Sequence, residues 1–366
     1  MNTKIKNYAV ILLASAFVLV LSVWGIVKPH GGFSESERRQ LAEFPKLNKE
    51  TVMSGEFMTD AESFALDNFP MRDKMRTIKA VTAMKLMGLK DNNGVYTSDG
   101  YISKLEYPMN TDSLENASER FKNVYDKYLS GTECNVYLSI IPDKNYFLAE
   151  ENGYPSIDYK KLEEYMRDKC SYMKYIDISD TLEISDYYRT DTHWRQEKIT
   201  DTALKLASEM GTAVSSDYSQ QLLDNPFYGV YYGQLALPFD ADEIYYLEND
   251  ILRNCKVYNY ETSSEGSLYD MEKAFGKDPY EMYLSGSVSL IEITNPNAVS
   301  DKELVVFRDS FGSSLAPLLA EGYSKITLVD IRYLSSAMIG NFIDFDKQDV
   351  LFLYSTLVLN NSVTLK

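Results

Sequence analysis

The chain has 366 residues and a formal net charge of −17 at pH 7. A chain of this length forms one large domain or two moderate ones, and it can bury a core without disulfide or metal staples. So negative a charge argues against a nucleic-acid partner, whose phosphates would be repelled. Cys134, Cys170 and Cys255 are too few for a disulfide framework, and none lies at the CxxC spacing of a zinc site. A single pair, Cys134 with Cys170, is left open.

An apolar, uncharged run over residues 8–27 follows two lysines near the N-terminus. About 20 such residues suffice to cross the hydrocarbon core of a bilayer as a helix. The preceding lysines favour an N-terminus inside the cell and a chain that lies outside it after the span. The prediction is an uncleaved, single-pass anchor in residues 1–28, with a cleaved signal peptide as the alternative.

Apolar positions recur at helical spacing over residues 54–90, and two turn signals predict a hairpin over residues 92–105. Beyond these, strands are expected at 136–141, 175–178, 304–307, 326–329 and 350–353, and helices at 113–130, 158–171, 195–210 and 311–321. This alternation predicts an α/β domain over residues 29–366 with a mainly parallel sheet. Residues 218–300 break the rhythm and are expected to form a β-rich insertion.

The sequence contains two histidines, His30 and His193. His30 follows the predicted span directly, where a structured active site is not expected. A serine or cysteine nucleophile needs a base that titrates near neutral pH, and histidine is the usual one. If the chain is a Ser-His enzyme, its base is therefore His193.

Asp191 lies two residues before His193, in the segment TDTHWR. In an extended or turn conformation, positions i and i+2 project to the same side. A carboxylate there can orient the imidazole and leave its other nitrogen for a nucleophile. The alternative is structural, because Asp191 and Thr192 are also good caps for the helix expected after them.

A candidate nucleophile lies in the segment VVFRDSFGSS, where a predicted buried strand ends at Arg308 and a helix follows. Ser310 is in the turn between them, and sites of open α/β sheets gather at the carboxyl ends of the strands. Backbone N–H groups at the start of the following helix can stabilise an oxyanion. Capping of that helix by Asp309 or Ser310 is the alternative.

Together, the segments DTHW at 191–194 and RDSFG at 308–312 resemble the motifs of two bacterial protein groups. These are the alginate O-acetyltransferase-like (AlgX/AlgJ-like) branch of the SGNH hydrolases and the related DHHW family of surface proteins. Other elements resemble the same families in the same order: SERRQL and FP at 36–45, DNFPMRD at 67–73, two turns at 93–100, IPDK at 141–144 and YLSG at 283–286. The resemblance runs from about residue 34 to the C-terminus, and the ordered set is more specific than any one motif.

The resemblance implies an SGNH-hydrolase-like three-layer fold with a circularly permuted motif order. It implies Ser310 as nucleophile, His193 as base and Asp191 as the residue that orients His193. The expected reaction passes an acetyl group through an acyl-serine intermediate to a hydroxyl of a cell-surface or secreted polysaccharide. The alternatives are a carbohydrate acetylesterase with the same triad and a catalytically idle polysaccharide-binding or assembly protein.

For oxyanion binding, the N–H of Ser310 is one expected donor and Gly286 is a second candidate, with a packing role for that glycine as the alternative. Arg308 replaces the glycine of a Gly-Asp-Ser enzyme, which leaves the rest of the oxyanion hole open. Lys144 and Arg308 are candidates to bind an anionic group of the substrate, with salt bridges inside the protein as the alternative. No cofactor or metal is expected. The expected partners are the polysaccharide, the membrane through the N-terminal helix, and a membrane-bound O-acyltransferase that supplies acetyl groups.

Overall fold

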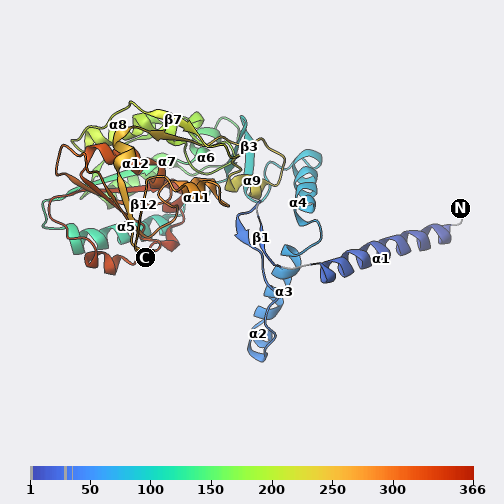
Figure 1. The fold of residues 1–366 in the computed structure, drawn as a ribbon. Coiled ribbons are helices and arrows are strands. Elements are labelled where there is room, and N and C mark those ends of the chain that lie inside the picture. The colour runs from blue at the N-terminus through green and yellow to red at the C-terminus, as the bar shows by residue number, and fades with distance from the viewer. Residues whose placement is uncertain (1–2, 29–30, 35) are drawn as a thin grey trace. The chain divides into compact units, whose positions relative to one another are not determined.

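The computed structural model describes residues 3–28, 31–34 and 36–366 (Figure 1). His30 lies outside the described residues. The chain divides into two compact units. The N-terminal unit is Met1–Asn93 with Tyr232–Pro238, and the main unit is Gly94–Tyr231 with Phe239–Lys366.

An eight-stranded sheet forms the centre of the main unit, in the strand order β10-β9-β11-β13-β12-β14-β5-β6. The parallel strands are β13 (Lys325–Val329), β12 (Glu303–Arg308), β14 (Asp349–Ser355), β5 (Asn135–Ile141) and β6 (Lys174–Tyr175). The antiparallel strands are β11 (Leu290–Thr294), β9 (Lys256–Asn259) and β10 (Ser264–Gly266). The predicted, mainly parallel sheet is confirmed, and its antiparallel edge comes from residues 218–300.

Both faces of the sheet are buried, because alternate residues of each strand pack into two different cores. In β12, Leu304 and Val306 belong to one core, whereas Val305 and Phe307 belong to the other. The first face is covered by α8 (Thr200–Glu209) and α12 (Gly312–Leu319), and the second by α5 (Thr111–Val124) and α7 (Tyr159–Lys169). Figure 1 shows α8 and α12 on the side of the sheet opposite α5. The predicted three-layer α/β architecture is therefore confirmed.

Shorter elements complete the main unit. The predicted hairpin consists of β3 (Val95–Ser98) and β4 (Tyr101–Lys104). The insertion also contains β7 (Ser219–Leu222), β8 (Tyr245–Glu248), α10 (Asp250–Asn254) and α11 (Met271–Ala274). Its helix α9 (Val230–Leu235) begins in the main unit and continues in the N-terminal unit from Tyr232. The remaining helices are α6 (Lys144–Leu148) and α13 (Thr356–Leu359). The three cysteines are unpaired, so the pair left open by the sequence does not form.

The N-terminal unit is mostly helical. Its first helix, α1 (Thr3–Val27), is long and apolar enough to cross a membrane, with a mean hydropathy of 2.7 in its most apolar window. The helical region predicted over residues 54–90 consists of α2 (Lys49–Ser54), α3 (Glu56–Asp67), α4 (Arg72–Val81) and a π-helical turn, Thr82–Leu86. The short strands β1 (Phe33–Ser34) and β2 (Arg39–Gln40) pair antiparallel.

The SERRQL and DNFPMRD motifs meet in an ion-pair network within this unit. Asp67 Oδ1 lies 2.5 Å from Arg39 Nη2. Glu37 pairs with Arg72 and, at 2.9 Å, with Arg76. The hydrogen bond from Arg39 lowers the pKa of Asp67 to about 2. Two motifs that are separate in the sequence therefore hold each other in the fold.

The segment Tyr232–Pro238 is held in the N-terminal unit by hydrogen bonds to its backbone. Three side chains donate to three consecutive carbonyl groups of the segment. The pairs are Arg76 with Gly233 (2.6 Å), Asn93 with Gln234 (2.8 Å) and Asn92 with Leu235 (2.8 Å). The N-terminal unit is thus completed by a segment from the middle of the chain.

Candidate active site

The side chains of Asp191, His193 and Ser310 come together at the carboxyl edge of the parallel strands. Ser310 Oγ lies 2.7 Å from His193 Nε2, and His193 Nδ1 lies 2.6 Å from Asp191 Oδ1. Ser310 lies two residues after the end of β12, whereas the other two lie in the connection between β6 and α8. In this geometry the imidazole can take a proton from the hydroxyl while the carboxylate holds the ring in place.

The Asp191 carboxylate is only 1% exposed, and groups on two segments of the chain hold it. Its Oδ1 also accepts the backbone N–H of His193 at 3.1 Å. Its Oδ2 accepts the backbone N–H of Val230 at 2.9 Å. The bond to the His193 N–H closes a local turn, so one side chain serves the turn and the imidazole together. Neither Asp191 nor Thr192 caps a helix: the next helical turn has Arg195 as its N-cap, and α8 has Ile199.

Gly229 lets the chain pass close enough for Val230 to reach Asp191. A Cβ atom at position 229 would lie 2.2 Å from Asp191 Cα, far inside van der Waals contact. The Gly229 N–H donates to Thr190 Oγ1 at 2.8 Å, and that hydroxyl donates to Asp242 Oδ2 at 2.6 Å. The tyrosine- and glycine-rich run around this position was expected to form a β-rich insertion beside the active site, but the contact of Gly229 with Asp191 was not predicted.

The His193 ring is held between aromatic side chains. It stacks on Tyr280, with the ring centroids 3.9 Å apart and the planes at 11°. Tyr280 O–H and Trp194 Nε1–H each form a hydrogen bond of 2.9 Å with Ser314 Oγ in α12. Trp194 Nε1–H also donates to the Phe311 carbonyl at 3.1 Å. No local pattern in the sequence pointed to Tyr280, because its place beside His193 arises only in the folded chain.

Asp309 fixes the turn that presents Ser310. One carboxylate oxygen accepts the N–H of Phe311 at 3.0 Å, and the other accepts the N–H of Ser355 at 2.8 Å. The second of these bonds joins the carboxyl ends of β12 and β14. Among the residues that the structure describes, the Ser310 backbone N–H donates no hydrogen bond, so it can bind an oxyanion.

Gly286, the second candidate for oxyanion binding, has its N–H engaged elsewhere. That N–H donates to the Tyr283 carbonyl at 3.1 Å. Gly286 ends a row of three residues with positive φ, after Leu284 (54°) and Ser285 (58°). Residues other than glycine rarely adopt this backbone conformation, so these three residues form a strained turn. The turn employs the glycine N–H, so of these two candidate donors only the Ser310 N–H has no partner among the described residues.

Arg308 is fully buried behind the turn. Its guanidinium donates to the carbonyls of Asp309, Gly286 and Val288 at 3.4 Å each, and Nη1 lies 3.9 Å from Asp330 Oδ2. Burial lowers the pKa of Arg308. The alternative to substrate binding was a salt bridge inside the protein, and of these contacts only the approach to Asp330 is of that kind.

Lys144, only 2% exposed, supports the loop that leads to Asp191. Its Nζ donates to the carbonyls of Tyr188 at 2.9 Å and Arg189 at 3.2 Å, and it lies 5.0 Å from the centre of the Tyr231 ring. Burial lowers the pKa of Lys144 to about 7, although the Asp191 carboxylate acts in the opposite direction. Its hydrogen bonds, like those of Arg308, go to backbone carbonyls of the protein.

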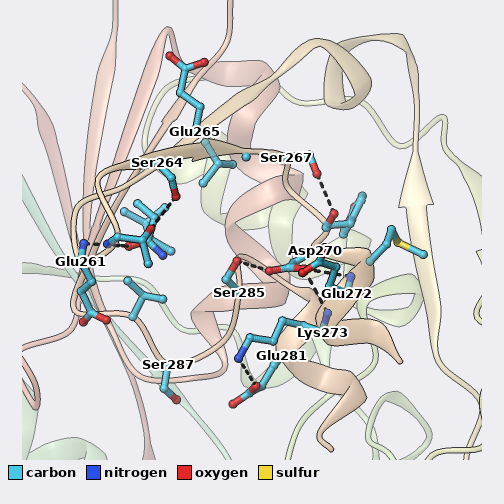
Figure 2. A pocket seen from close by; sticks show the side chains of 18 residues that line it. Glu261, Ser264, Glu265, Ser267, Asp270, Glu272, Lys273, Glu281, Ser285 and Ser287 are labelled. Atoms are coloured by element: carbon cyan, nitrogen blue, oxygen red, sulfur yellow. Dashed lines mark hydrogen bonds and ion pairs between the residues drawn. The ribbon is translucent and has the colours of Figure 1, made fainter. Parts of the chain in front are cut away.

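A separate hollow of about 640 Å³ lies beside β9, β10 and α11 (Figure 2). Its carboxylates are Glu261, Glu265, Asp270, Glu272 and Glu281. Lys273 Nζ lies 2.9 Å from Glu281, and Ser285 Oγ donates to Asp270 at 2.8 Å. The three residues of the candidate triad do not line it. Within the described part of the chain, no group of three or more His, Cys, Asp and Glu side chains could hold a metal ion.

No protein-family model matches the chain, and no curated protein matches it. Solved structures do match. A DHHW family protein from Eubacterium siraeum DSM 15702 is 21% identical, with a TM-score of 0.60 over 74% of this chain and 93% of that one. PatB1 of Bacillus cereus with a sulfonyl adduct is 18% identical, with a TM-score of 0.57 over 72% of this chain and 95% of that one. The fold implied by the sequence resemblance is therefore confirmed.

We expect Gly229→Ala to weaken both the fold and the site. The added methyl group must push residues 229 and 230 away from Asp191, which breaks the bond from the Val230 N–H. The free energy of unfolding should fall by about 1–3 kcal/mol, as for other overpacked sites. Urea unfolding and hydrolysis of a chromogenic ester would measure the two effects. Gly266→Ala is the matched control, because a Cβ there meets nothing within 4 Å. Equal effects of the two substitutions would refute the assigned role.

Lys144 should make stability depend on pH. Its pKa is about 7 in the folded chain against an ordinary value of 10.5, so between these values the unfolded chain binds more protons. The cost of burying the charge is complete below about pH 7 and is relieved as the pH rises. From about pH 7 to pH 9 the wild type should gain roughly 2 kcal/mol that Lys144→Met does not gain. Urea unfolding at both pH values tests this.

The control for this experiment is Lys160→Met, which removes an exposed lysine of α7. Its stability should follow the pH dependence of the wild type. The same pH dependence in Lys144→Met and the wild type would show that Lys144 does not lose its proton in this range.

Proposed function

We propose that the chain is an acyltransferase of the O-acetyltransferase-like kind, anchored in a membrane and acting on a cell-surface or secreted polysaccharide. The observation that carries the proposal is the continuous chain from Ser310 Oγ through His193 to Asp191, with steps of 2.7 and 2.6 Å. The fold shared with the DHHW family protein and PatB1 supports it. So does the ordered set of motifs in the sequence.

In the first half of the reaction, Ser310 Oγ attacks the carbonyl carbon of an acetyl donor while its proton passes to His193 Nε2. Asp191 stabilises the imidazolium that forms, and the Ser310 N–H donates to the oxyanion. When the tetrahedral intermediate collapses, the bond to the leaving group breaks. His193 returns the proton to that group, and the acetyl group remains as an ester of Ser310.

In the second half, a sugar hydroxyl attacks the acetyl-serine. His193 takes the hydroxyl proton and returns it to Ser310 Oγ as the serine ester breaks, so the product is an acetylated sugar and the enzyme is restored. Water in place of the sugar would release acetate. The difference between a transferase and an esterase therefore lies in which hydroxyl reaches the acetyl-serine.

The groups around the triad favour these proton transfers, because they hold the imidazole in place and stabilise the oxyanion. The stacked ring of Tyr280 and the hydrogen bonds of Trp194 keep the imidazole plane fixed between Asp191 and Ser310. The N-terminus of α12, which begins two residues after Ser310, adds a positive partial charge where the oxyanion develops. Such preorganised groups act without reorganising during the reaction.

The anchor belongs to the same proposal. Helix α1 has the length and hydropathy to span a bilayer, and the lysines before its apolar run favour a cytoplasmic N-terminus. The remainder of the chain would then lie outside the cell. There a membrane-bound O-acyltransferase could deliver acetyl groups to Ser310.

We expect Ser310→Ala and His193→Ala each to lower acetyl release from a chromogenic acetyl ester by at least about 10³-fold, because nucleophile and base act as one unit. The assay uses the full chain in detergent micelles. Ser313→Ala is the matched control: its buried hydroxyl on α12 has no hydrogen-bond partner among the described residues, so activity should persist. Unchanged activity in Ser310→Ala would exclude the proposed nucleophile.

Adding acceptor oligosaccharides to the assay distinguishes transfer of the acetyl group to a sugar from its hydrolysis by water. Acetylated sugar, detected by mass spectrometry, is the expected product, whereas free acetate alone would identify an esterase. A sulfonyl fluoride should label Ser310, because such reagents react with activated hydroxyl groups and PatB1 has been solved with a sulfonyl adduct. Absence of both acetyl release and labelling would favour an idle polysaccharide-binding protein.

A further inference from the structure

Residues 71–90, here called the basic segment, differ in charge from the chain as a whole. They contain six Lys and Arg residues and one acidic residue, in a protein with a net charge of −17. The segment comprises α4, the π-helical turn after it and the residues up to Lys90. A basic, amphipathic helix is typical of a protein surface that meets anionic lipid.

The two inner arginines of the basic segment bind within the N-terminal unit. Arg72 and Arg76 both pair with Glu37. Lys74 and Lys85 are exposed, and at helical spacing they lie on the same face as Ile78, which is also exposed. The arginines therefore turn inward, while lysines and apolar side chains share the outer face.

Large apolar side chains are also exposed in the part of the basic segment that follows α4. Leu86 is 78% exposed and Met87 is 70% exposed, and Leu89 and Val81 are exposed as well. Single exposed apolar residues are ordinary on protein surfaces, but a group of them in one short segment marks an interaction site. This combination of apolar and cationic groups fits the headgroup region of an anionic bilayer.

The basic segment begins where the candidate membrane span ends. The last turns of α1 and the end of α3 line a common groove of about 380 Å³, with Gly25 and Pro70 among the lining residues. Lys28 Nζ donates to the Phe69 carbonyl at 3.4 Å. Met71, the N-cap of α4, follows Pro70 directly. If α1 spans the bilayer, α4 therefore starts at the level of its outer surface.

We propose that the basic segment lies on the outer surface of an anionic bilayer. Ile78, Leu86 and Met87 enter the headgroup region, and Lys74 and Lys85 meet lipid phosphates. This inference rests on the proposed anchor and adds to it. A single span permits rotation about its axis, whereas a second contact beside it fixes the orientation of the N-terminal unit on the membrane.

The test places tryptophan on the basic segment of the full chain. Trp24→Phe removes the tryptophan of α1 from every variant, and Trp194 remains as a buried background signal. Leu86→Trp is the probe, and Val299→Trp is the matched control at a fully exposed position of the main unit. The proteins are reconstituted in vesicles of phosphatidylglycerol and phosphatidylcholine with brominated acyl chains, and in vesicles of brominated phosphatidylcholine alone.

In the anionic vesicles, the brominated chains should quench Leu86→Trp at least about twofold more than Val299→Trp, with a blue shift of emission. Adding Lys74→Glu and Lys85→Glu, or raising the salt concentration, should reduce the difference. If Leu86→Trp is quenched as strongly in vesicles without phosphatidylglycerol as in vesicles with it, the assignment to anionic lipid is overturned. If the tryptophan of Leu86→Trp becomes buried only after another membrane protein is added to the vesicles, the assignment to lipid is overturned altogether.

Two further outcomes separate this inference from the proposals on which it rests. A chain that stays in the vesicles but shows equal quenching at both positions would overturn the surface contact and leave the anchor intact. A chain that the vesicles do not retain would overturn the anchor and this inference together. The ester assay in micelles does not depend on the bilayer, so its result distinguishes a failure of the enzyme from a failure of membrane docking.

Discussion

A buried carboxylate needs hydrogen-bond donors that the protein itself supplies, and the arrangement around Asp191 follows from this requirement. Its oxygens accept two backbone N–H groups and the imidazole of His193. One of those N–H groups belongs to Val230, which approaches only because Gly229 has no side chain. Lys144 then holds the carbonyls of the loop that leads to the carboxylate. The carboxylate proposed to orient His193 is thus fixed before any substrate arrives.

The other half of the site rests on the edge of the sheet. Asp309 joins the ends of β12 and β14 through the N–H of Ser355. Asp143, after β5, accepts the hydroxyl of Thr356 at 2.6 Å and joins β5 to β14 in the same manner. Three neighbouring parallel strands are therefore linked by buried carboxylates at the edge where Ser310 lies. Linked strands of this kind hold a nucleophile in place better than a free loop would.

The features that sequence could predict are those written in local patterns. Short apolar runs between amphipathic helices revealed the layered α/β fold, and two compact motifs contained Asp191, His193 and Ser310. The features that were missed depend on contacts between distant segments. The stacking of Tyr280 on His193 and the need for glycine at position 229 have no local signature, because each depends on which segment the fold brings alongside.

Charged side chains were the other difficulty. Lys144 and Arg308 were candidates for contacts with an anionic substrate, with salt bridges inside the protein as the alternative. Both are buried, and backbone carbonyls are their main partners. Whether a charged residue faces a ligand or supports a turn is decided by the surrounding backbone, which a sequence pattern does not specify.

The segment Tyr232–Pro238 affects how the protein can be shortened. The two units interleave in sequence, so cleavage of the chain between residues 93 and 94 would not separate them cleanly. A fragment that starts at residue 94 keeps the carbonyls of residues 233–235 and loses the three side chains that bind them. Val230, a donor to Asp191, lies only two residues before that segment. Removing the N-terminal unit would therefore release a segment of the chain that continues directly into the candidate active site.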